Sequence, residues 1–142
     1  TVIKKAWFDK VKFDSHITKY GHDDTQLSCQ LSTLNLKLKH IDNPVEHGDI
    51  DSNEAYLKKS KSSLENLVIL FEEGKINSHF SRLISLLLML NKLHLTYLIS
   101  LIYNSIEGFL IGNLKGKNPN LLLYNIFRIG YLCKISAEKP KN

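Results

Sequence analysis

The sequence has few of the residues that build disulfide scaffolds or irregular chains. Its 142 residues include two cysteines, three prolines and seven glycines. Two cysteines make neither a disulfide framework nor a four-thiolate zinc site, and a single bridge between Cys29 and Cys133 is left open. The composition excludes collagen-like and low-complexity chains. No Asn-x-Ser/Thr sequence occurs, which excludes N-glycosylation. The sequence begins at Thr1 and its one methionine is Met89, which fits a processed secretory chain and a trimmed one equally.

Acidic residues are scarce in the second half of the chain. Residues 1–79 hold 11 Lys and Arg against 12 Asp and Glu, whereas residues 80–142 hold 8 against 2. The formal charge of +5 therefore belongs to the C-terminal half, which is also the more apolar half. A basic and apolar region predicts an anionic partner, and the alternative is that its lysines only keep the protein soluble.

Motifs for catalysis and metal binding are missing or incomplete. Asp49, Asp51 and Asn53 match the first positions of a calcium loop, but its glycine and its final glutamate are absent. His79 lies beside serines without a nucleophile elbow. Several histidines lack the spacing that places two metal ligands on one helix face: His16, His22, His40 and His47. The sequence thus predicts a protein that is not an enzyme and has no metal or cofactor. Aromatic residues do not alternate with basic ones, which disfavours nucleic acid as a partner.

Hydrophobic spacing predicts helices along the whole chain. Apolar residues at spacings of four and three from Leu27 to Ile41 predict a helix that begins at Asp24 or Thr25 and stops at Asn43-Pro44. A strand through Leu34–Leu38 is the alternative for part of this segment. Residues 3–11 predict a short helix from Ile3, Trp7 and Val11.

Cap residues delimit three further helices. Asp51 or Ser52 begins one that ends at Gly74, and Asp51 with Glu54 resembles a capping box. Asn77 caps the next helix, and Asn118-Pro119 begins the last, which runs to about Ile135. The first of these helices is predicted to bury one face: Leu57, Leu64, Leu67, Val68 and Phe71. With Leu27, Leu31 and Leu34, this face supplies the predicted core.

The segment Phe80–Leu114 contains no proline and has only a narrow polar stripe. One continuous helix would be about 50 Å long, so we expect a break near Asn91-Lys92 or near Gly108. Leu and Ile contribute about −0.3 to −0.6 kcal/mol each to membrane insertion, but a central Lys costs about 3 kcal/mol, which disfavours a stable span. The segment is then either a buried central helix or one that lies in a lipid interface. The predicted fold is all-α: a single domain over residues 1–142, a bundle of four or five helices with one long apolar helix.

Several short stretches carry a family likeness: Asn77-Ser78-His79-Phe80 before an apolar helix, Asn91-Lys92, Ile102 to Lys117, and Ala137-Glu138-Lys139-Pro140. They resemble the abalone sperm lysin family, and the high content of Leu and Ile is closer to that family's fusogenic paralogue. The resemblance implies a secreted, acrosomal helical protein that acts in fertilisation without covalent chemistry. A second, weaker likeness, to a small helical exosome-cofactor domain, rests on Gly116, Asn118-Pro119 and Arg128-Ile129.

These observations predict a basic and apolar surface that disrupts or fuses an egg or sperm membrane or acts on the egg coat. The partner would be an anionic membrane surface or an egg-coat glycoprotein, and a second copy of the chain is a further candidate. The predicted electrostatic face is Lys92, Lys115, Lys117, Arg128 and Lys134, and the predicted apolar contacts are Leu86, Leu90, Tyr97 and Phe109. The alternative is an intracellular helical interaction module, a complex subunit that associates with protein or RNA.

Overall fold

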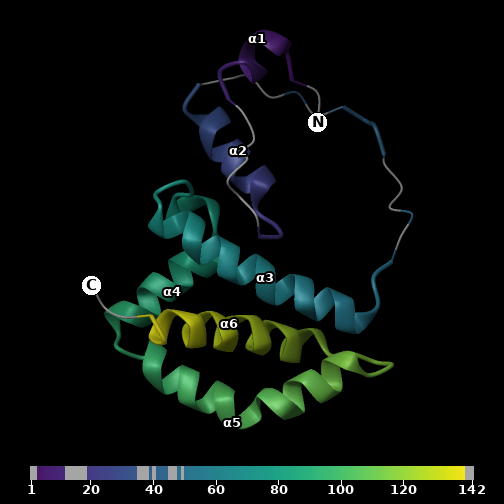
Figure 1. Cartoon of the computed structure of the whole chain (residues 1–142), viewed down its shortest axis with the longest axis vertical. Helices are drawn as coiled ribbons and strands as arrows, with labels where there is room; N and C mark the ends of the chain where they lie inside the picture. The colour runs from purple at the N-terminus through teal and green to yellow at the C-terminus, as the bar shows by residue number, and fades with distance from the viewer. Residues whose placement is uncertain are drawn as a thin grey trace.

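The computed structural model describes residues 3–11, 19–34, 39, 41–44, 48 and 50–139. These residues form six α-helices and one short 3₁₀ helix, and none of them lies in a strand (Figure 1). The elements are α1 (Lys5–Phe8), α2 (Asp23–Ser32), α3 (Asn53–Glu72), η1 (Ser78–Phe80), α4 (Arg82–Lys92), α5 (Thr96–Lys115) and α6 (Leu121–Ala137). The all-α fold is confirmed, with one helix more than the four or five predicted.

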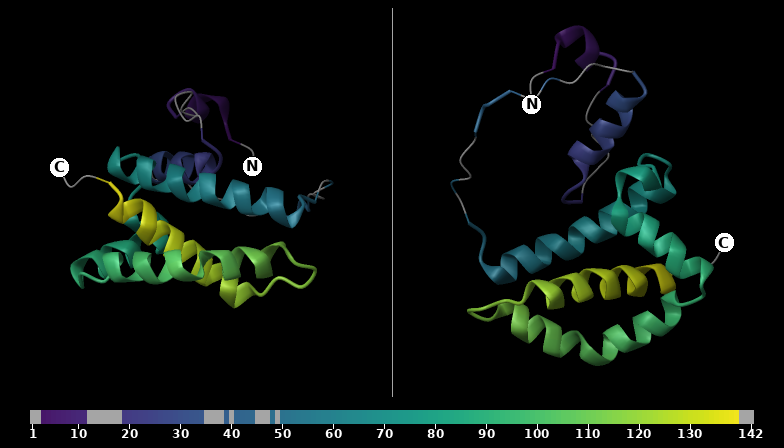
Figure 2. Two further views of the ribbon diagram at one scale, coloured as in Figure 1. Left: turned by 60° about the horizontal axis from the view of Figure 1, so that its bottom comes forward. Right: turned by 180° about the vertical axis from the view of Figure 1, so that it is seen from behind.

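Helix α6 lies between α3 and α5, and α4 closes one end of this layer (Figures 1 and 2). Helices α5 and α6 form an antiparallel hairpin with the most extensive contact in the fold. Their close approach depends on Gly130, because a Cβ atom there would lie 2.2 Å from the Tyr103 ring. Helices α1 and α2 lie on the other side of α3 (Figure 1). Helix α5 is therefore covered by α6 on one side only.

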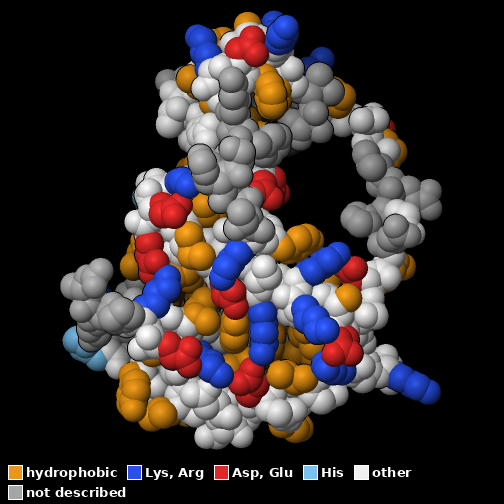
Figure 3. Space-filling view, in the orientation of Figure 1, with side chains coloured by type: hydrophobic (Ala, Val, Ile, Leu, Met, Phe, Trp, Pro, Cys, Tyr) orange, Lys and Arg blue, Asp and Glu red, His pale blue; other side chains and the backbone are white. Residues whose placement is uncertain are grey.

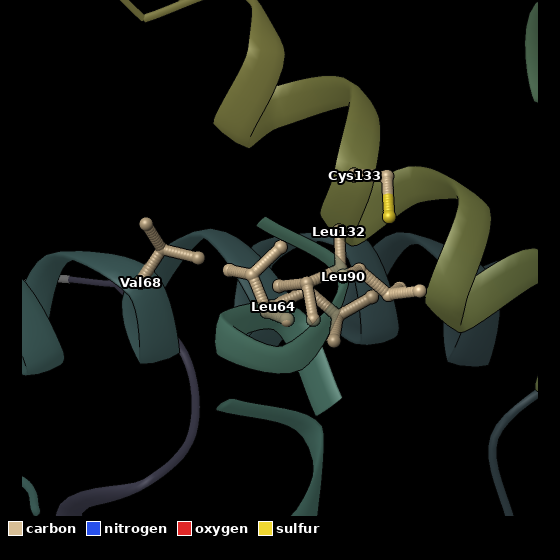
Figure 4. Packing of buried hydrophobic residues seen from close by; sticks show 6 residues of the cluster. Leu64, Val68, Leu90, Leu132 and Cys133 are labelled. Carbon is tan, nitrogen blue, oxygen red and sulfur yellow. The ribbon is translucent and has the colours of Figure 1, made fainter. Parts of the chain in front are cut away.

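The core is built mainly by α3, α4, α5 and α6. Figure 4 shows one cluster, in which side chains of α3, α4 and α6 meet. A second cluster joins Tyr103 and Leu110 of α5 to Leu57 of α3 and Phe127 of α6. Among the predicted core residues, Leu27, Leu64 and Leu67 are buried, whereas three are only partly buried: Leu31, Leu34 and Phe71.

Several predicted caps are confirmed and others shift. Ser52, not Asp51, caps α3 by accepting a hydrogen bond from the Ala55 backbone N–H at 3.3 Å. Gly74 ends that helix with φ +70, as predicted. The Asn77 side chain accepts from the His79 backbone N–H in η1, and a separate cap begins α4. The last helix begins later than predicted, because Asn120 accepts hydrogen bonds from two N–H groups of the first turn.

Helix α2 is shorter than the apolar spacing predicted. It ends at Ser32, and Ile41 lies outside any helix with 64% of its surface exposed. The hydroxyls of Ser32 and Thr33 donate to backbone carbonyls within the last turn, and such bonds compete with continuation of a helix. The alternative strand at Leu34–Leu38 falls largely outside the described residues.

The single long apolar helix is replaced by α4 and α5, whose axes meet at 113°. The break follows Asn91-Lys92, one of the two predicted places, and α5 continues through Gly108. His94 has φ +57, and the N–H groups of His94 and Leu95 donate to the carbonyls of Asn91 and Leu90. These two bonds form a Schellman motif, which stops a helix and redirects the chain. The Thr96 hydroxyl also donates to Asn91 Oδ1 at 2.5 Å across the corner.

Candidate functional site

The charged side chains of α5 all face the rest of the molecule. The helix carries two of them, Glu107 and Lys115. Glu107 pairs with Lys61 of α3 at 2.7 Å and with Lys134 of α6 at 3.2 Å. Lys115 pairs with Glu54 of α3 at 2.9 Å. The solvent-facing side of this 20-residue helix is therefore uncharged along its whole length.

Large apolar side chains occupy that uncharged side. We call it the outer α5 surface, and it comprises Tyr97, Leu98, Leu101, Ile102 and Phe109, each with 47–68% of its area exposed. Small residues lie among these side chains and one turn beyond them: Ser105, Gly108 and Gly112. A Cβ atom built on either glycine would meet no neighbour within 4 Å. In Figure 3 the lowest rim, where α5 runs, shows hydrophobic and uncharged side chains, whereas red and blue alternate across the middle.

The apolar exposure continues around the corner into α4. Leu93 and Leu95 flank the break, and Leu88 and Met89 lie on the solvent side of α4. All four have between 37% and 56% of their area exposed. An apolar side chain that is exposed alone is ordinary, but a row of them without a charge marks an interaction surface.

Two of the predicted apolar contacts belong to this surface and two do not. Tyr97 and Phe109 are among its most exposed members. Leu90 is buried and Leu86 packs against the same core cluster, because α4 turns that face toward α3 and α6. The prediction for Leu86 and Leu90 was wrong. It missed Leu98, Leu101 and Ile102, although their three-and-four spacing with the small residues was visible in the sequence.

The predicted basic residues do not form one face. Lys115 and Lys134 are paired with glutamates, and the Arg128 guanidinium lies 5.6 Å from the Tyr124 ring centroid. Lys92 and Lys117 are exposed, and within the described part of the chain neither makes an ion pair. They stand near opposite ends of α5, about 30 Å apart along the helix axis. The single electrostatic face is thus replaced by two free lysines that bracket the outer α5 surface.

The Glu107 cluster holds α5 in this orientation. Burial opposes the charge of Glu107, but hydrogen bonds from Lys61, Lys134 and Tyr103 keep the pKa of its carboxyl below the usual value. Burial and the nearby Glu107 raise the pKa of Tyr103, so its hydroxyl stays protonated and donates to Glu107 at 3.0 Å. A carboxylate with three donors is well satisfied at a half-buried site. Rotation of α5 would break the bonds to Lys61 of α3 and Lys134 of α6, so the apolar residues stay outward.

The other candidate sites of the sequence gain no support. Within the described ranges no three His, Cys, Asp or Glu side chains lie close enough to hold a metal ion. His16, His40, His47 and Asp49 lie outside those ranges. Both cysteines are free, and burial raises the pKa of Cys133 to about 11.

Among the described helices, none is by itself both long and apolar enough to cross a membrane. Helices α4 and α5 together satisfy the length and composition requirement, but their 113° bend separates them into two directions. No protein-family model, curated protein or solved structure matches the chain.

Proposed function

We propose that the protein acts without covalent chemistry by laying α5 and the α4–α5 corner onto an anionic membrane surface. The observation that carries the proposal is the uncharged, apolar outer α5 surface with an unpaired lysine near each end. Apolar side chains enter the boundary between headgroups and acyl chains, and lysines remain at the level of the anionic headgroups.

The magnitudes fit reversible binding. Full burial of a large apolar side chain is worth about 1.5–3 kcal/mol, so five half-exposed ones contribute about 5 kcal/mol. Lys92 and Lys117 add about 1 kcal/mol each near an anionic bilayer. A total of about 7 kcal/mol corresponds to a dissociation constant of about 10 μM. The protein would therefore associate with a membrane without spanning it.

The lysin-family resemblance supplies a biological setting for this proposal. The chain would be secreted from the acrosome and would meet an egg or sperm membrane, where an inserted apolar helix perturbs lipid packing. The egg-coat glycoprotein is the second anionic partner of this proposal. Lys92 and Lys117 serve the electrostatic step in both cases.

A second candidate is an intracellular interaction module whose outer α5 surface is covered by a protein helix. Gly108 and Gly112 favour it, because small residues four apart let a second helix approach closely, and open space surrounds both. The outer α5 surface of a second copy, with the same small residues, is a self-complementary partner.

Cosedimentation with vesicles tests the membrane proposal. We expect binding to vesicles that contain anionic lipid, weaker binding to neutral vesicles, and loss of affinity as salt rises. The double variant Leu101→Gln/Ile102→Gln should bind at least tenfold more weakly. Ile50→Gln is the matched control, because Ile50 is almost fully exposed and distant in sequence from α5. Lys92→Glu/Lys117→Glu should remove the preference for anionic lipid.

Two outcomes contradict the membrane proposal. One is equal binding of the wild type and the Leu101→Gln/Ile102→Gln variant to anionic vesicles. The other is the absence of binding at every lipid composition. A dimer in analytical ultracentrifugation that dissociates in the same double variant would instead support the interaction module.

A further inference from the structure

A concave site, separate from the outer α5 surface, lies on the side of α6 away from α5. A cavity of about 710 Å³ opens between α3, α6 and the segment that leads into α2. This volume is within the range of small-molecule sites. Its walls include Tyr20 and His22 before α2, Tyr56 and Ser63 of α3, and Tyr124 and Arg128 of α6. None of these residues belongs to the outer α5 surface.

Three hydroxyl groups at one wall leave one hydroxyl proton without an acceptor among the described residues. Tyr124 donates to the Tyr56 hydroxyl at 3.3 Å, and the Ser60 hydroxyl lies 3.0 Å from the Tyr124 hydroxyl. Each hydroxyl has one proton, so Ser60 must donate to Tyr124 when Tyr124 donates to Tyr56. The Tyr56 proton then remains, and no described residue accepts it.

Arg128 supplies a positive charge that no carboxylate neutralises. Among the described residues it forms no ion pair, and its guanidinium stacks on the Tyr124 ring. By contrast, Lys59 at the same cavity pairs with Asp51 at 2.8 Å. Burial lowers the pKa of His22 and keeps its imidazole neutral near pH 7. The described residues of the cavity walls therefore carry one net positive charge.

The remaining walls are aromatic. The rings of Tyr56 and Tyr124 lie 5.7 Å apart at 39°, and Tyr20 forms part of the wall with Lys59 5.4 Å above its ring. Aromatic faces bind flat apolar groups, and a guanidinium binds planar carboxylates through two parallel hydrogen bonds. One net positive charge suits a monoanion better than a doubly charged phosphate ester.

We infer that this cavity binds a small aromatic carboxylate, whose carboxylate accepts hydrogen bonds from Arg128 and the Tyr56 hydroxyl and whose ring lies among Tyr20, Tyr56 and Tyr124. The ligand would enter from water, because the cavity and the outer α5 surface lie on different sides of α6. Binding here and binding to lipid are therefore separable.

Titration of the full chain with 2-naphthoate, followed by two-dimensional amide NMR, tests this inference. We expect saturable shifts that centre on Tyr56, Ser60, Tyr124 and Arg128. The neutral isostere 2-naphthamide should bind at least tenfold more weakly, because it lacks the charge that Arg128 recognises. The ester 2-naphthyl phosphate should bind no more tightly than 2-naphthoate.

Two variants test which side chains bind the carboxylate of 2-naphthoate. Arg128→Gln should weaken 2-naphthoate binding at least tenfold, whereas Arg82→Gln, which removes the same charge from an exposed position on α4, should leave it unchanged. Tyr56→Phe keeps the ring and removes the free proton, and it should weaken binding several-fold even if Arg128→Gln fails to fold. Equal affinity for the acid and the amide, shifts centred elsewhere, or no shifts at millimolar ligand would overturn the inference.

Discussion

The two sides of α5 differ in how their polar groups are satisfied. On the inner side, Glu107 binds two lysines and a tyrosine, and Lys115 pairs with Glu54 of α3. The outer side carries no charge, and Gly108 and Gly112 lie there with open space around them. A surface that only faces water has no reason to exclude charge, so the difference indicates that the outer α5 surface meets something apolar.

Three of the basic residues in the C-terminal half form ion pairs. Lys115, Lys134 and Lys139 are paired, two of them with glutamates of α3 and one with Glu107. Glutamates of α3 thus neutralise two of the basic residues that residues 80–142 carry. Among the described residues of this half, those without an ion pair are Lys92 and Lys117 beside the apolar surface, Arg128 at the cavity and Arg82 at the start of α4.

Glycine substitutions on the inner and outer sides of α5 should change the free energy of unfolding in opposite directions. Gly130→Val forces a side chain into the Tyr103 ring, so we expect the free energy of unfolding to fall by about 3 kcal/mol. Gly112→Ala meets open space within a helix and should raise it by about 0.5–1 kcal/mol. Urea denaturation measures both. If Gly130→Val were harmless, the α5–α6 packing described above would be wrong.

The Glu107 cluster should make stability depend on pH. Because the pKa of Glu107 is lower in the folded chain, its contribution is present above the unfolded value near 4.5 and is lost as pH falls through the folded value. Glu107→Gln should cost about 2 kcal/mol at pH 7, since it leaves Lys61 and Lys134 half-buried without a carboxylate. It should also flatten the fall in stability as pH drops below the unfolded value near 4.5. An identical pH profile in the variant would assign that dependence to other carboxyl groups.

A smaller effect than those of Gly130→Val and Glu107→Gln is expected at the corner between α4 and α5. His94 adopts a left-handed backbone conformation that glycine adopts without strain. His94→Gly should therefore stabilise the fold by about 1 kcal/mol, which calorimetry would record as a higher Tm. A lower Tm would mean that the His94 side chain contributes more than its backbone costs.

The sequence was sufficient for both ends of α3 and for the break between α4 and α5. Ser52, Gly74 and the break after Lys92 follow from local chemistry that does not depend on the rest of the fold. The orientation of the helices was not accessible in this way. Leu90 and Leu101 look alike in the sequence, but α4 buries the first and the α5–α6 hairpin leaves the second outside.

The pairing of the basic residues was beyond sequence reasoning for the same reason. Lys115 meets Glu54 across a separation of 61 residues, and Lys134 meets Glu107 across the hairpin. Only the tertiary fold brings these charges together, so Lys115 and Lys117 appeared equivalent although one is neutralised.

Tryptophan fluorescence tests the membrane account most directly. With Trp7→Phe as background, Phe109→Trp places a single reporter on the outer α5 surface, and Ile50→Trp places one at an exposed position before α3 that is not part of that surface. In anionic vesicles the emission of the Phe109→Trp reporter should shift to shorter wavelength and be quenched by brominated lipid, while that of the Ile50→Trp reporter changes little. If the protein binds the vesicles and the reporter at position 109 stays in water, the outer α5 surface is not the membrane contact.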